Sequence, residues 1–187
     1  MKLLKKTQVQ KLRVVSMSYL QDREWSDRYI PAVKAIVGSH LLVESPLEVD
    51  RQQATDLVVL NARNLAIACR VRRPGYADKY PYEFTIRSRI ISGATTELQK
   101  ITNGWGDWMF YGHAAPKPGI KINHWFLINL KSWRAHMIRR HRSAIRYGEK
   151  SNSDGTSFAW FDLSSFPPEP PILVASSKPL PGYRQIA

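Results

Sequence analysis

One acidic residue and a group of arginines stand close together on neighbouring segments of this chain. Asp56 begins the apolar run DLVVL, and the next two segments carry five cations: Arg70, Arg72, Arg73, Arg87 and Arg89. An acid at the start of one strand, opposed by cations on the next two, is how several nucleases build a phosphodiester-cleaving site. The same arginines would equally suit a phosphate-binding surface that performs no chemistry. These residues alone are compatible with both a cleaving and a non-cleaving site.

The charge balance indicates the class of partner. The chain has 28 Lys and Arg residues against 15 Asp and Glu residues, a formal net charge of +13. A cationic protein gains affinity for polyphosphate through counterion release, which makes binding salt-sensitive and largely independent of base sequence. DNA or RNA is therefore the expected partner, and an acidic protein is the alternative.

Membrane insertion and secretion do not fit this sequence. No segment approaches the roughly 20 consecutive apolar residues of a membrane-spanning helix, and no amphipathic lysine-rich stretch has a wide apolar face. Residues 1–17 are basic but lack the apolar middle of a secretory leader. Cys69 is the only cysteine, which excludes an intramolecular disulfide and favours a reducing compartment such as the cytoplasm.

Length and periodicity predict the architecture. With 187 residues and 43% hydrophobic content, we expect one globular domain over 1–175 and a disordered tail over 176–187. Apolar periodicity predicts helices over 22–37, 95–103 and 132–141. Strands are predicted over 56–60, 65–73, 82–91, 107–113, 124–130, 157–163 and 172–175, with 61–64 as a hairpin connection between the first two. This order indicates an α/β or α+β domain whose central mixed sheet is flanked by helices.

Strand alternation sorts the charged residues onto faces. Over 82–91, Phe84 and Ile86 share one face, while the other face is polar: Glu83, Thr85, Arg87 and Arg89. Arg70 and Arg72 likewise share one face of the preceding strand. If the two polar faces coincide, four guanidiniums form one surface matched to an oligonucleotide backbone or an acidic protein. The alternative is that these arginines pair internally with Asp56, Glu83 and Glu97.

Two resemblances follow from these residues. The helix, the strand opening at Asp56, the two further strands, the helix over 95–103 and a further strand resemble the αβββαβ core of the PD-(D/E)XK restriction-endonuclease-like superfamily. The whole chain is also similar to a group of uncharacterised tailed-phage proteins, through the stretches RVRRPGY, EFTIRS, TELQKI, GWGDWMFYG and SDGTSF. The phage resemblance carries no function with it, but it places the protein in the cytoplasm of a host cell.

The nuclease resemblance implies a metal site, but this sequence departs from the motif of the superfamily at one metal ligand. In that superfamily the strand-start aspartate and a Glu-x-Lys pair on the next strand hold a divalent metal and position water. Asp56 matches the aspartate, but the next strand reads Ala-Cys-Arg-Val-Arg over 68–72, so one carboxylate must come from elsewhere. Glu83 or Glu97 would supply it, with Lys100 one turn after Glu97. The resemblance therefore implies Mg²⁺ or Mn²⁺ held by Asp56 with Glu83 or Glu97, and Lys100 as a catalytic cation.

Several of these residues have simpler interpretations. Asp56 would cap a turn or pair with an arginine, and Glu97 with Lys100 would form an exposed helical ion pair. Arg139 and Arg140 end a basic helix and extend the predicted nucleic-acid-binding surface. The aromatic residues Trp105, Trp108, Phe110 and Tyr111 would either stack bases or pack the core.

The sequence thus favours a phage-type nucleic-acid-binding protein, with a divalent-metal-dependent nuclease as the catalytic version of this hypothesis. The alternative is a non-catalytic protein that binds and inhibits host defence or host nucleic-acid machinery. The sequence leaves the choice between DNA and RNA and the oligomeric state open.

Overall fold

The computed structural model describes residues 21, 24–44, 57–59, 65–116, 119–139 and 145–181. Two of the candidate site residues, Asp56 and Arg140, lie outside the described residues. All the other candidate site residues lie within the described ranges.

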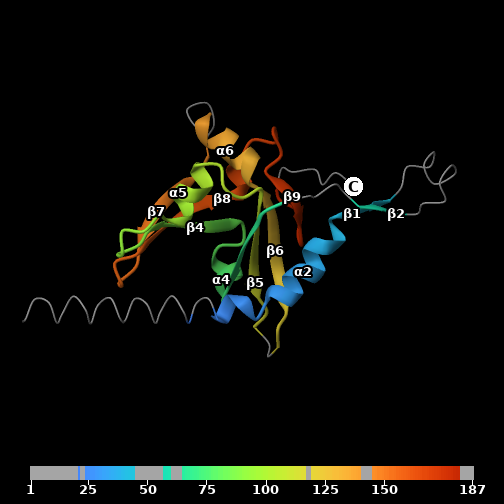
Figure 1. Ribbon diagram of the computed structural model, residues 1–187, viewed down its shortest axis with the longest axis horizontal. Helices are drawn as coiled ribbons and strands as arrows, with labels where there is room; N and C mark the ends of the chain where they lie inside the picture. The colour runs from blue at the N-terminus through green and yellow to red at the C-terminus, as the bar shows by residue number, and fades with distance from the viewer. Residues whose placement is uncertain are drawn as a thin grey trace, which may run out of the picture.

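The described part of the chain has a mixed α+β fold with two larger sheets (Figure 1). The first sheet has the order β3-β5-β6-β9, with β3 parallel to β5 and the other pairs antiparallel. Its strands are β3 (Ile67–Arg72), β5 (Trp108–Ala114), β6 (Ile122–Asn129) and β9 (Leu173–Ser176). The second sheet is antiparallel with the order β4-β8-β7: β4 (Glu83–Arg89), β7 (Tyr147–Ser151) and β8 (Ser157–Asp162).

The remaining elements are short. A separate antiparallel pair joins β1 (Leu42–Glu44) to β2 (Leu57–Val59). The helices whose bounds are described are α2 (Ile30–Ser39), α4 (Tyr76–Lys79), α5 (Glu97–Thr102) and α6 (Leu130–Ile138), with the 3-10 helix η2 (Leu163–Ser165) after β8. Within the described ranges, no helix combines the length and the apolar character needed to cross a membrane.

Two apolar cores lie on the two faces of the four-stranded sheet. Between the sheets, Phe84 and Ile86 of β4 pack with Met109 and Phe126, and all four are fully buried. On the opposite face, α2 covers β5 and β6, as Figure 1 shows. Each fully buried side chain of this size stabilises the fold by about 1.5–3 kcal/mol relative to exposure, so both faces of β5 are held firmly.

Local signals explain where the helices begin. The Thr96 side chain accepts a hydrogen bond from the Gln99 backbone N–H, and the Gln99 side chain accepts one from the Thr96 backbone N–H. This capping box satisfies two otherwise unpaired donors at the start of α5. At the start of α6, the Asn129 side chain accepts hydrogen bonds from the backbone N–H groups of residues 131 and 132. The position of Glu97, the first residue of α5, is therefore fixed by its own sequence neighbourhood.

The predicted hairpin between the strands at 56–60 and 65–73 is wrong. The structure pairs β2 with β1, and it pairs β3 in parallel with β5. The reason is that β5 is buried on both faces and needs a strand on each edge, and β3 fills the edge opposite β6. A parallel pair demands a crossover connection, which here includes α4, β4 and α5.

The C-terminal half contains a strand that the sequence did not predict. No strand was expected between residues 130 and 157, but β7 ends at Ser151 and pairs with β8 around a tight turn at Asp154 and Gly155. The disordered tail over 176–187 stays a prediction, and residues 182–187 lie outside the described residues. Within this range, Ser176 ends β9 and Leu180 is buried in the core between the sheets.

Candidate functional site

A row of polar side chains lies where the two sheets approach each other. We call it the polar seam and define it by Arg70 and Arg72 of β3, Glu83, Thr85 and Arg87 of β4, Glu97 of α5, and Tyr111 and His113 of β5. The register pairs Arg70 with Tyr111 and Arg72 with His113, so these four side chains share one face of the sheet. The odd-numbered face of β4 supplies the rest, as its alternation predicts.

The centre of the seam is a buried pair of hydroxyl groups. The Thr85 Oγ1 and Tyr111 Oη atoms are 3.1 Å apart, and an Arg70 guanidinium nitrogen is 3.5 Å from the same threonine oxygen. Thr85 and Tyr111 are both almost completely buried. Burial raises the pKa of the Tyr111 phenol, because the phenolate would lose its hydration there. The two hydroxyls therefore stay neutral and link β4 to β5.

Glu97 ties the seam together. Its Oε2 atom forms a salt bridge with Arg70 and also accepts a hydrogen bond of 3.1 Å from the Arg87 backbone N–H. The internal pairing that was the alternative for the arginines is thus found at Arg70. Lys100 is exposed on α5, and Glu97 pairs with Arg70 rather than with Lys100 in the part of the chain that is described.

The other seam arginines are differently placed. The Arg72 guanidinium stacks over the Tyr76 ring at 4.3 Å from its centroid. Arg87 lies near Asp154, where its charge adds to the hydrogen bonds from Thr156 that lower the pKa of that carboxyl. Among the described residues, neither Arg72 nor Arg87 forms an ion pair with a carboxylate.

Arg89 departs from the expected four-arginine surface. A register shift between Arg87 and Arg89 interrupts the alternation of β4, and Arg89 is exposed at the end of the strand. The bulge moves this cation off the face that holds Thr85 and Arg87. Arg70, Arg72 and Arg87 thus line the seam, and Arg89 extends it outward.

Glu83 is the second carboxylate of the seam. Burial, with a smaller contribution from the charge of Asp162, raises the pKa of its carboxyl. Asp162 is its register partner on β8 and is itself bound by Arg146 at 2.6 Å. A cation beside Glu83 would relieve both effects.

The described carboxylates do not by themselves form a metal centre. Within the described ranges, no group of three or more His, Cys, Asp and Glu side chains is placed to hold a metal ion. Glu97 also gives one of its oxygens to two internal donors. Glu83 and Glu97 have the oxygen donors that Mg²⁺ prefers, but a complete site would require Asp56, which lies outside the described residues.

The remaining predicted residues lie away from the seam. Arg73 stacks on Trp25 at 5.0 Å, and Arg139 is an exposed residue at the end of α6. Of the aromatic group, Phe110 and Tyr111 are buried and Trp108 packs against the core beneath α2, so they build the fold. Trp105 alone of that group is 73% exposed.

Sequence reasoning missed His113. This side chain is only 2% exposed, and neither ring nitrogen has a hydrogen-bond partner among the described residues. Its ring stacks on His124 at 5.4 Å and meets Tyr111 edge-on at 5.5 Å. Burial, with the nearby His124 and Arg72, lowers the pKa of His113 to about 4. No histidine motif marks it, but its alternation with Tyr111 on an apolar strand was a usable signal.

Its neighbour His124 is satisfied. One ring nitrogen, Nε2, lies 2.6 Å from the Pro81 carbonyl, and the Ser177 hydroxyl lies 3.2 Å from Nδ1. The carbonyl can only accept, so Nε2 carries the proton and Nδ1 accepts from the serine. This histidine connects β6 to the loop before β4 and needs no catalytic role.

No protein-family model, curated protein or solved structure matches this chain. The geometry and charge of the seam therefore carry the functional argument.

His113 should make the stability of the protein depend on pH. Its folded-state pKa of about 4 lies below the ordinary value of 6.5, so the unfolded chain takes up the proton first as pH falls. The free energy of unfolding should drop by roughly 3 kcal/mol from this group between pH 6.5 and 4. Urea denaturation at several pH values should show this loss in the wild type and a smaller loss in His113→Leu. Parallel pH profiles of the two proteins would show that His113 is not the titrating group.

Proposed function

We propose that this chain is a nucleic-acid-binding protein that contacts the phosphate backbone along the polar seam. The observation that carries the proposal is that Arg72, Arg87 and Arg89 have no carboxylate ion-pair partner among the described residues, while Arg70 beside them is held by Glu97. The seam thus combines an anchored cation with two cations, Arg72 and Arg87, that remain available for an external anion, and Arg89 lies exposed just beyond them. A net charge of +13 makes polyphosphate the natural anion.

The geometry favours directed hydrogen bonds to phosphate groups over nonspecific attraction by the net positive charge. A guanidinium presents a planar fork that donates two hydrogen bonds to phosphate oxygens. Stacking on Tyr76 limits the rotamers of Arg72 before any ligand arrives, so less conformational entropy is lost on binding. Contacts of this kind read the backbone and not the bases, which supports binding of DNA or RNA with little sequence preference.

An acidic host protein is the alternative partner for the same cations. In that case, the chain would inhibit host defence or host nucleic-acid machinery without catalysis. Both versions place its action in the host cytoplasm, as the resemblance to tailed-phage proteins implies. They differ in one respect that a test can use, since only the first requires direct binding to purified nucleic acid.

Metal-dependent cleavage is the second candidate function. One observation favours it: the carboxylates of Glu83 and Glu97 both border the face of β4 that carries Thr85 and Arg87. Asp56 with Glu83 or Glu97 would hold Mg²⁺ or Mn²⁺, which would supply charge neutralisation at the phosphate. Lys100 and the seam arginines would orient that phosphate.

Binding should be strongly salt-dependent and should weaken when seam arginines are lost. We expect Arg87→Gln combined with Arg89→Gln to flatten the slope of log affinity against log salt by about one unit for each lost phosphate contact. Fluorescence anisotropy with a labelled duplex and a labelled single strand, each titrated at several salt concentrations, measures this slope.

Lys34→Gln combined with Lys131→Gln is the matched control, because it removes the same charge from exposed positions on α2 and α6. An equal change in both double variants would mean that net charge alone drives binding. No binding to any nucleic acid at low salt would contradict the proposal and favour an acidic protein partner.

The nuclease candidate predicts metal-dependent cleavage that needs Asp56. Asp56→Asn should abolish cleavage in Mg²⁺ or Mn²⁺ and leave metal-free binding intact, because removing a negative charge does not weaken attraction for phosphate. Gel analysis of plasmid, single-stranded DNA and RNA measures cleavage, and thermal melting checks the fold. Wild-type protein that cuts none of these substrates with either metal would leave a binding protein only.

A further inference from the structure

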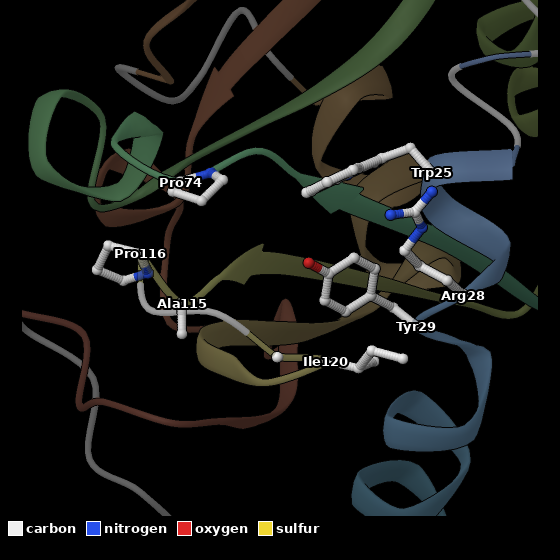
Figure 2. Close-up of a pocket in the computed structure, with 8 residues that line it drawn as sticks. Trp25, Arg28, Tyr29, Pro74, Ala115, Pro116 and Ile120 are labelled. Atoms are coloured by element: carbon white, nitrogen blue, oxygen red, sulfur yellow. The ribbon is translucent and has the colours of Figure 1, made fainter.

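A second candidate ligand site lies on the far side of β3 from the polar seam. It is a cleft of about 430 Å³, within the size range of small-molecule sites. Its lining residues are Trp25, Arg28, Tyr29, Pro74, Ala115, Pro116, Gly119 and Ile120. Figure 2 shows them arranged around one space, with the prolines facing Tyr29 and Ile120 across it.

The cleft has a hydrogen-bonding group directed into it. Tyr29 is only 3% exposed, and Figure 2 shows its hydroxyl directed into the cleft. The cleft is open, so this hydroxyl can donate a hydrogen bond to a bound ligand or accept one from it. The ring of Tyr29 is fixed by Trp25, whose centroid lies 5.3 Å away, so the hydroxyl is held in position.

The rim of the cleft is cationic. The Arg28 guanidinium lies 5.2 Å from the centroid of the Trp25 ring, and that of Arg73 lies 5.0 Å from the same ring. Such stacking restrains Arg28 at the edge of the apolar space. An anionic group attached to the ligand would meet this guanidinium while the rest of the ligand lies between the apolar walls.

We propose that the cleft binds one unpaired nucleotide, with the base between the prolines and Tyr29 and its phosphate at Arg28. A base is planar and apolar on its faces, and its edges carry donors and acceptors that can form a hydrogen bond with the Tyr29 hydroxyl. This inference rests on the proposed nucleic-acid-binding function and narrows it to strands that contain at least one unpaired nucleotide. The same chemistry is offered by a free mononucleotide and by a strand, so the test separates the two.

The test compares a labelled single strand with a blunt duplex of the same sequence, by anisotropy at fixed salt. Tyr29→Phe removes only the hydroxyl and keeps the ring, so it should weaken single-strand binding by about three- to tenfold, as expected for one hydrogen bond. Arg28→Gln should also weaken single-strand binding and flatten its salt slope by about one unit. Duplex binding should be unchanged in both. Lys34→Gln, an exposed cation on α2, is the matched control for charge, and thermal melting checks that each variant folds.

The outcomes are distinguishable. Wild-type and variant proteins that bind the single strand equally would overturn the cleft proposal and leave the seam function intact. Equal weakening for single strand and duplex would also overturn it, since the cleft would then not select an unpaired nucleotide. Wild-type protein that binds neither probe would overturn the proposed function itself.

A competition arm identifies the source of the nucleotide. A mixture of 5′-mononucleotides is added at equal nucleotide concentration to the complex with the single strand. If the mixture displaces the strand from the wild type but not from Tyr29→Phe, the cleft is assigned to free mononucleotides. Failure of that mixture to compete, with the strand still sensitive to Tyr29→Phe, would assign it to a nucleotide within a strand.

Discussion

The carboxylate of Glu97 holds together the parts of the molecule on which its proposed function depends. It accepts hydrogen bonds from a side chain of the four-stranded sheet, Arg70, and from the backbone of the three-stranded sheet at Arg87. The capping box at Thr96 and Gln99 sets where α5 begins and therefore where this carboxylate lies. Half-buried charges of this kind need both partners, because removing one would leave the other uncompensated. This one carboxylate therefore links the two sheets at Arg70 and Arg87, beside the apolar core that packs them together.

The polar seam is an unusual feature for the junction of two apolar layers. Phe84 and Ile86 are fully buried on one face of β4, while Thr85 on the other face joins Tyr111 in a buried hydroxyl pair. His113 extends this polar row with two unpartnered ring nitrogens, which destabilises the fold. Natural proteins tolerate such destabilising groups mainly at functional sites. The seam and its cations are consistent with a surface selected for a ligand and not only for stability.

Much of this fold could be predicted from local patterns, but strand pairing could not. Period-two alternation correctly predicted the polar face of β4 at Glu83, Thr85 and Arg87, and apolar periodicity predicted a helix over 95–103, where α5 lies. Pairing depends on which edges are left unsatisfied in three dimensions, so the expected hairpin before β3 was wrong and the β7-β8 hairpin was missed. The same limit applies to the site. The sequence showed four arginines, but only the packing of α5 revealed that Arg70 is held by Glu97, and only the bulge showed that Arg89 leaves the common face. Asp56, on which the nuclease hypothesis depends, stays a prediction.

The most direct test of the phosphate-binding seam is to observe its guanidinium groups by NMR while a short oligonucleotide is added at low salt. We expect the side-chain Nε–Hε resonances of Arg72, Arg87 and Arg89 to shift, with smaller changes at Arg70, because Glu97 already holds it. Assignment by single Arg→Lys variants identifies each resonance. Shifts confined to other residues, with the resonances of Arg72, Arg87 and Arg89 unmoved at saturating oligonucleotide, would contradict the account.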